Sequence, residues 1–129
     1  MAANKILLID DDEGFLESNR ELLEAMEYDV RTASNGSDGF ALALEYRPDL
    51  VILDVMMTYD TEGFDVARKI RSHPDLRNVK MLMVSGIVRD KKLTGPPKPD
   101  ADWLPVDRIL EKPIDPPKLL SEVKRLLLE

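Results

Sequence analysis

Five residues of this sequence could carry out chemistry together: Asp10, Asp11, Asp54, Ser85 and Lys112. Each of them is the last residue of a predicted β-strand or lies within two residues after one. If the strands are parallel, their carboxyl ends meet at one edge of the sheet, where open α/β folds bind their ligands. The sequence therefore predicts that these five side chains lie close together.

The types of these side chains indicate what they could bind. Three carboxylates at one edge repel each other and need a compensating cation. Oxygen ligands without His or Cys favour a hard ion, most simply Mg²⁺, which keeps several waters and also takes phosphate oxygens. A hydroxyl and an ammonium group on the other side suit a phosphoryl group, whose spread negative charge needs several donors. The pattern predicts phosphoryl chemistry at a magnesium site.

The strand before Asp54 is the central element that must position these groups. Residues 50–53 are four consecutive apolar residues between Pro48 and Asp54. The run is too short for a helix and predicts a strand buried on both faces, as in the middle of a parallel sheet. Other short runs predict strands over residues 6–9, 80–85 and 108–111, and a weak alternation predicts an edge strand over residues 28–33.

Helices are predicted between the strands from apolar residues at three- and four-residue spacing. The first would follow Asp12 and Glu13, whose charges suit a helix start, and later ones would cover residues 37–46, 64–71 and 116 onward. Residues 88–105 predict a truncated helix or an irregular loop, because their prolines cannot continue a helix. The expected inward residues are Phe15, Asn19, Leu22, Leu23 and Met26 in the first helix, Phe40, Leu42 and Leu44 in the second, Phe64, Ala67 and Ile70 in the third, and Leu119, Leu120, Val123, Leu126 and Leu127 in the last.

This alternation of strands and helices predicts an α/β fold: a parallel sheet with helices on both faces. A length of 129 residues indicates one domain, 1–129, and 43% apolar with 33% charged residues is typical of a soluble globular protein. The net charge of −7 argues against nucleic acid or an anionic membrane as a direct partner. There is no cysteine, no segment long enough to span a membrane and no signal-peptide pattern, so we expect a cytoplasmic protein.

Four segments, in this order and at these separations, resemble a response-regulator receiver domain of two-component and phosphorelay signalling. They are Leu-Ile-Asp-Asp at 8–11, Asp-Leu-Val-Ile-Leu-Asp-Val-Met-Met at 49–57, Val-Ser-Gly at 84–86 and Leu-Glu-Lys-Pro at 110–113. The resemblance extends over essentially the whole chain. It implies a doubly wound, flavodoxin-like five-stranded parallel sheet in the order 2-1-3-4-5, forming a single receiver domain over residues 1–129.

The resemblance also implies roles for individual residues. Asp54 matches the aspartate that accepts a phosphoryl group from a histidine kinase or a histidine phosphotransfer protein. Asp11, Asp54 and the backbone carbonyl of Met56 match the Mg²⁺ ligands, with Asp10 acting mainly through a water. The residues matched to the phosphoryl group itself are Ser85, Gly86 and Lys112.

The implied function is that of a phosphorylatable switch, not a turnover enzyme. Such a domain would signal by contact with a downstream protein target, as a monomer or weak dimer. Met56 and Ile87 would flank the approach of a hydrolysing water, and both are bulky and apolar. We therefore expect at most slow self-dephosphorylation.

Two positions depart from the family pattern. Thr58 stands where the family usually has a proline, and Ile109 stands where it usually has an aromatic residue that takes part in switching. Together with the prolines of residues 88–105, these departures leave the usual route of activation in doubt. Our hypothesis is that residues 88–105 transmit activation here.

Two other functions remain open at this point. One is a receiver-like adaptor that is not phosphorylated. The other is a haloacid-dehalogenase-like phosphatase with Asp10 as the nucleophile, although that function would leave Asp54 without a role. Asp12 is interpreted as a helix-start charge, and a shifted acid pair of Asp11 and Asp12 is the alternative.

Overall fold

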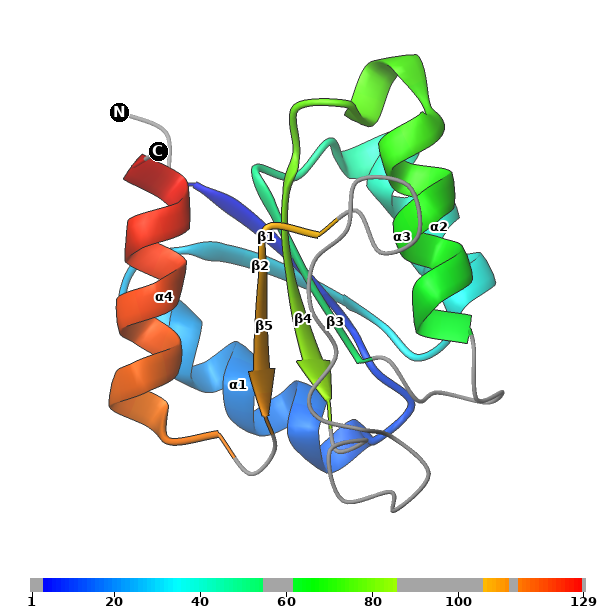
Figure 1. Cartoon of the computed structure of the whole chain (residues 1–129). Helices are drawn as coiled ribbons and strands as arrows, with labels where there is room; N and C mark the ends of the chain where they lie inside the picture. Colours follow the sequence, from blue (N-terminus) through cyan, green and yellow to red (C-terminus); the bar gives the residue numbers. More distant parts are fainter. Residues whose placement is uncertain (1–3, 55–61, 86–105, 112–113, 129) are drawn as a thin grey trace, which may run out of the picture.

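The computed structural model describes residues 4–54, 62–85, 106–111 and 114–128 (Figure 1). Its five strands form one parallel sheet in the order β2-β1-β3-β4-β5. The predicted fold class and strand order are confirmed. The strands are β1 (Lys5–Ile9), β2 (Asp29–Ala33), β3 (Leu50–Asp54), β4 (Lys80–Ser85) and β5 (Arg108–Glu111).

The central position of β3 follows from its residues. All five residues of β3 are buried, and the strand pairs with β1 on one side and β4 on the other. A strand with neighbours on both edges and helices on both faces has no surface in water, which is why an unbroken apolar run suits it. The edge strand β2 has the pattern exposed, buried, exposed, intermediate, buried, as its weaker alternation predicted.

Helices cover both faces of the sheet (Figure 1). The helices are α1 (Glu13–Ala25), α2 (Gly36–Tyr46), α3 (Glu62–Ser72) and α4 (Pro116–Leu128), with a short 3-10 helix η1 (Pro74–Leu76) after α3. Side chains of β1, β3 and β4 alternate between the faces, so one strand supplies both hydrophobic cores. One core includes Ile9, Leu53 and Met83 with α2 and α3, and the other includes Leu8, Ile52 and Leu82 with α1 and α4.

The inner face of α1 differs from the prediction. The buried residues of α1 are Leu16 and Leu23, whereas Met26 is 55% exposed. The helix ends at Ala25, and Glu27 then adopts a positive φ of 70° that turns the chain toward β2. Met26 therefore lies just beyond the end of the helix, although the predicted inner face included it.

The faces of α2 and α4 are confirmed with one addition. Phe40, Leu42 and Leu44 of α2 are partly buried against the core. The buried residues of this helix are Gly36, Gly39, Ala43 and Tyr46. In α4, Leu119, Val123 and Leu126 are buried, and Leu120 and Leu127 pack partly buried around them.

Helix α3 is longer than predicted, and it buries Val66 in addition to the expected Ala67 and Ile70. The 3-10 helix after it was not predicted. His73 caps that short helix, since its Nδ1 accepts a hydrogen bond of 3.1 Å from the Asp75 N–H. The predicted loop at residues 88–105 lies outside the described residues. Within the described ranges, no helix combines the length and apolar character that a bilayer crossing requires.

Candidate functional site

The site begins where β1 ends. The Asp10 N–H donates a hydrogen bond of 3.1 Å to the carbonyl of Ala33, so the backbone of Asp10 continues the pairing between β1 and β2. Its Oδ1 accepts a hydrogen bond of 2.9 Å from the Asp12 N–H. Asp10 has no exposed surface, whereas Asp11 is exposed. The two consecutive acids thus have opposite environments.

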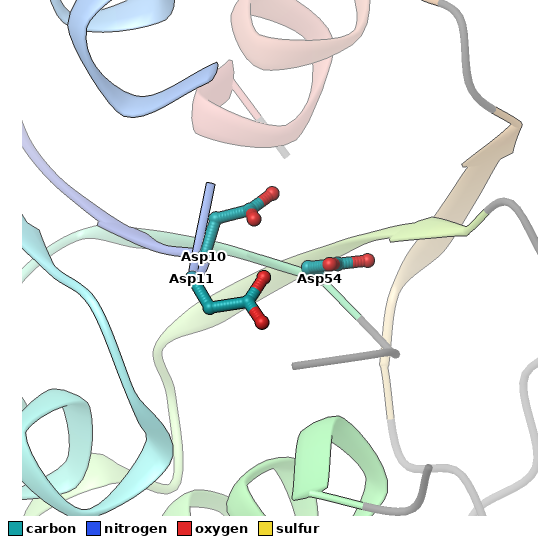
Figure 2. Close-up of side chains that lie close together, drawn as sticks. All are labelled: Asp10, Asp11 and Asp54. Carbon is teal, nitrogen blue, oxygen red and sulfur yellow. The ribbon is translucent and has the colours of Figure 1, made fainter. Parts of the chain in front are cut away.

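Asp54 approaches from the adjacent central strand. It is the last residue of β3, lies opposite Val84 of β4 and is 5% exposed. One carboxylate oxygen from each of Asp10, Asp11 and Asp54 lies within 4.8 Å of the other two. Figure 2 shows the three side chains lying close together, two from the residues that follow β1 and one from the end of β3. The predicted acidic cluster is therefore formed.

The donor set of this cluster fits a hard divalent cation. Two nearly inaccessible carboxylates beside a third one are tolerated only with compensating positive charge. Oxygens bound about 2.1 Å from an octahedral Mg²⁺ lie roughly 3 to 4.2 Å apart, a separation that the cluster allows. The exposed Asp11 leaves one side of the cluster open to solvent. Receiver domains typically bind Mg²⁺ in an acidic pocket of this kind.

Asp12 has a different role from its two neighbours. It is the N-cap of α1, and its Oδ1 accepts a hydrogen bond of 3.2 Å from the Phe15 N–H. A carboxylate satisfies an otherwise unpaired backbone donor there and suits the positive end of the helix dipole. This geometry supports the helix-start interpretation, because Asp10 and Asp11 are the acids that meet Asp54.

The backbone register also brings the next two strands to this edge. Ser85 is the last residue of β4, directly after Val84, and it pairs with Glu111 of β5. Lys112 follows Glu111 in the sequence but lies outside the described residues, as do Met56, Gly86, Thr58 and Ile87. The roles expected for Ser85, Gly86, Lys112 and Met56 remain predictions.

Ile109 lies within β5, where it pairs with Met83. Its side chain is partly buried against the core on the α2–α3 face. The structure therefore gives this position an aliphatic packing role.

Two backbone contacts of the site had no sequence signal. They are the Ala33 carbonyl and the Asp12 N–H, which fix the main chain and the side chain of Asp10. Backbone groups are present at every residue, so their use becomes visible only when the strands are in place.

Comparison with known proteins gives consistent results. The model of the response regulator receiver domain family matches residues 6–124. Response regulator PleD of Caulobacter vibrioides is 33% identical over 127 residues, covering 95% of this chain and 26% of PleD. RpaA of Synechocystis sp., described as a DNA-binding dual master transcriptional regulator, is 34% identical over 125 residues, covering 95% of this chain and 48% of RpaA.

A solved structure agrees with this assignment. The chemotaxis protein CheY4 of Vibrio cholerae superposes with a TM-score of 0.81 at 26% identity, covering 97% of this chain and 99% of CheY4. The present chain spans only about a quarter to a half of the length of the first curated relatives it matches. With a family match over residues 6–124 and the same sheet order as expected, the chain belongs to the response regulator receiver domain family of two-component signalling.

Proposed function

We propose that this chain is a phosphoacceptor of a two-component phosphorelay, with Asp54 receiving the phosphoryl group. The observation that carries the proposal is the convergence of Asp10, Asp11 and Asp54 within 4.8 Å at the carboxyl edge of the sheet. Asp54 ends the central strand, where open α/β sheets bind their ligands. The donor would be a phosphohistidine of a histidine kinase or a histidine phosphotransfer protein.

The proposed reaction is a transfer between two side chains. A carboxylate oxygen of Asp54 attacks phosphorus, the P–N bond of the phosphohistidine breaks, and the imidazole leaves. The product is an acyl phosphate on Asp54, which water later converts back to carboxylate and inorganic phosphate. Strand β3 holds the carboxylate in place, since the residues before Asp54 are paired on both sides.

The other residues of the site would hold the metal and the phosphoryl group. Asp11 and Asp54, with the Met56 carbonyl, would bind Mg²⁺ directly, and Asp10 would bind it mainly through a water. A bound Mg²⁺ supplies positive charge next to the phosphoryl oxygens. Ser85, Gly86 and Lys112 would donate to those oxygens from the ends of β4 and β5. The position of Ser85 beside Val84, the partner of Asp54, supports that arrangement.

We further propose that residues 1–129 act as a single receiver domain in the cytoplasm. The domain would pass the signal on by contact with a downstream protein, as a monomer or weak dimer. It would be a switch, not a turnover enzyme, and family membership favours this over the haloacid-dehalogenase-like phosphatase.

The test is incubation with Mg²⁺ and acetyl phosphate, followed by intact-mass analysis. We expect one phosphoryl adduct per chain, which disappears when Mg²⁺ is chelated and is absent from Asp54→Asn. The label should then decay slowly once the donor is removed, because Met56 and Ile87 are bulky and apolar and, by the resemblance, would flank the approach of water. Loss of most of the label within seconds would contradict the slow hydrolysis.

A matched control tests whether labelling depends on the acidic cluster or on any carboxylate nearby. Asp12→Asn removes an adjacent carboxylate but keeps an N-cap, since Asn caps helices as well as Asp does. This variant should be labelled like the wild type. A folded wild type that binds Mg²⁺ without becoming labelled would favour the non-phosphorylated adaptor, and phosphate release that survives Asp54→Asn would move the nucleophile to Asp10.

A further inference from the structure

A second surface of the molecule has features of a binding site. A groove of about 660 Å³ lies between α2 and the end of α3. Its lining residues are Phe40 of α2, Asp65, Arg68, Lys69 and Ser72 of α3, and His73 and Pro74 at the start of η1. We refer to it as the α2–α3 groove. None of these residues belongs to the acidic cluster.

The floor of the α2–α3 groove is built from rings. Phe40 is half-buried, and its ring meets the ring of His73 edge to face, with 6.1 Å between the centroids and 66° between the planes. Pro74 adds a third apolar surface beside them. Rings held by neighbouring elements present apolar area that an incoming side chain can cover without first ordering the floor.

The rim of the groove offers hydrogen-bond donors. Arg68 and Lys69 carry positive charge, and the carboxylate of Asp65 is already 2.7 Å from the Arg68 guanidinium. Lys69 is exposed, and among the described residues no ion pair involves it. The Nδ1 of His73 accepts from the Asp75 N–H, so in the neutral ring the hydrogen is on Nε2, which can donate.

The charge of this region is opposite to that of the whole chain. The charged lining residues are two cations, Arg68 and Lys69, and one acid, Asp65, in a chain whose net charge is −7. A positively charged rim around an apolar floor attracts a ligand that has carboxylates next to an apolar side chain. A basic or purely apolar ligand would give the exposed Lys69 no carboxylate to pair with.

We propose that the α2–α3 groove binds an acidic peptide segment of a partner protein. An aromatic or aliphatic side chain of that segment would rest on Phe40 and His73, and its carboxylates would face Lys69 and Arg68. Helix α3 starts on the side of the sheet where Asp54 lies and runs back to the start of β4, so the His73 end is at the opposite edge from the acidic cluster. The His73 end of the groove can therefore be occupied while Asp54 remains accessible.

The experiment is selection of short peptides from a random displayed library against the purified protein. We expect the enriched peptides to combine acidic residues with an aromatic or large aliphatic residue. Their affinity, measured by fluorescence anisotropy, should fall about tenfold or more in Lys69→Glu and be largely kept in Lys69→Arg, because a charge reversal replaces attraction with repulsion.

The control is Lys124→Glu, which makes the same charge change at an exposed position of α4, on the other face of the sheet. It should bind the peptides like the wild type. Equal loss in both variants, enrichment of peptides without acids, or no enrichment at all would overturn the proposal.

Two further measurements test whether a second copy of the chain occupies the groove and whether peptide binding affects phosphorylation. Light scattering that shows a dimer lost in Lys69→Glu would assign the groove to a second copy and overturn the proposal. Labelling by acetyl phosphate with saturating peptide should match labelling without it, and blocked labelling would contradict simultaneous occupation. Because binding is measured without phosphorylation, failure of the phosphoacceptor proposal would leave this test intact.

Discussion

At the scale of residues, the acidic cluster brings together three carboxylates from the ends of two neighbouring strands. Asp10 is fully buried and Asp54 is 5% exposed, and both have an oxygen within 4.8 Å of one on Asp11. Three carboxylates gathered this closely form an oxygen ligand set for a hard cation. A native state with such a cluster is expected to gain stability from any cation that binds it, because the unfolded chain does not gather the three acids.

The first prediction is therefore that Mg²⁺ stabilises the folded protein. At a concentration about tenfold above its Kd, the gain in unfolding free energy should be about 1.4 kcal/mol. Asp11→Asn removes a ligand at an exposed position and should lose most of this gain. Thermal unfolding with and without Mg²⁺, at matched ionic strength, measures the difference.

Asp12→Asn is the matched control for that measurement, since it removes a charge next to the cluster and keeps the helix cap. It should retain the Mg²⁺-dependent rise in Tm. An equal rise in wild type and Asp11→Asn would show that the ion acts elsewhere.

At the scale of elements, the distance between α2 and the sheet depends on Gly39. A Cβ placed on this residue would lie 2.6 Å from Cδ1 and 2.9 Å from Cγ1 of Ile9, the residue that directly precedes Asp10. Ile9 is 1% exposed and enclosed by the core, so it has little room to move. The absence of a side chain at position 39 therefore allows α2 to pack closely on β1.

The second prediction is that Gly39→Ala destabilises the protein. Overpacking a filled core costs about 1–3 kcal/mol, which exceeds the helix-propensity gain of roughly 1 kcal/mol from replacing Gly by Ala. Urea unfolding should show a lower midpoint. Gly14→Ala in α1 is the comparison, because its Cβ would meet only the Asp12 carboxylate, at 3.2 Å, and this variant should not lower the midpoint. Similar losses in both variants would contradict the packing argument.

A second element-scale feature fixes the opposite edge of the sheet. Arg71 of α3 donates to the carbonyls of Arg77 and Val79, at 2.7 and 2.9 Å, and to Asp107 Oδ2 at 3.1 Å. The same Oδ2 accepts from the Met81 N–H at 2.8 Å. One arginine thereby joins α3 to the starts of β4 and β5, the two strands whose far ends reach the candidate site.

At the scale of the whole molecule, the sheet divides the interior into two cores. Ile70 of α3 belongs to the core under α2 and α3, and Ile6 of β1 belongs to the core under α1 and α4. Both are 0% exposed. Since the backbone of the sheet lies between them, a cavity in one core does not reach residues of the other.

The third prediction is that small cavities in the two cores act independently. Ile6→Val and Ile70→Val should each cost about 0.5–1.5 kcal/mol. The double variant should cost their sum within about 0.5 kcal/mol, as for distant sites that share no partner. Unfolding in urea of the wild type, both single variants and the double variant gives the coupling energy. A coupling well above that limit would indicate that strain passes through the sheet.

The sequence by itself determined which segments form strands and at which edge of the sheet the acids lie. Strands β4 and β5 have the predicted bounds, because each apolar run is closed at both ends by charged or turn-forming residues. The rule that parallel strands share a carboxyl edge predicted Asp10, Asp11 and Asp54 at one edge, and the pairing of β1 with β3 brings them together.

Only the tertiary structure decided features that depend on distant partners. Met26 continues the helical spacing yet is exposed, because the turn at Glu27 toward β2 ends the helix first. The fit of Gly39 against Ile9 and the contact of Arg71 with Asp107 join residues far apart in the chain. The periodicity of the sequence indicates which face of a helix or strand is apolar. The distance and angle at which two elements pack depend on the shapes of both surfaces, which come into contact only in the folded state.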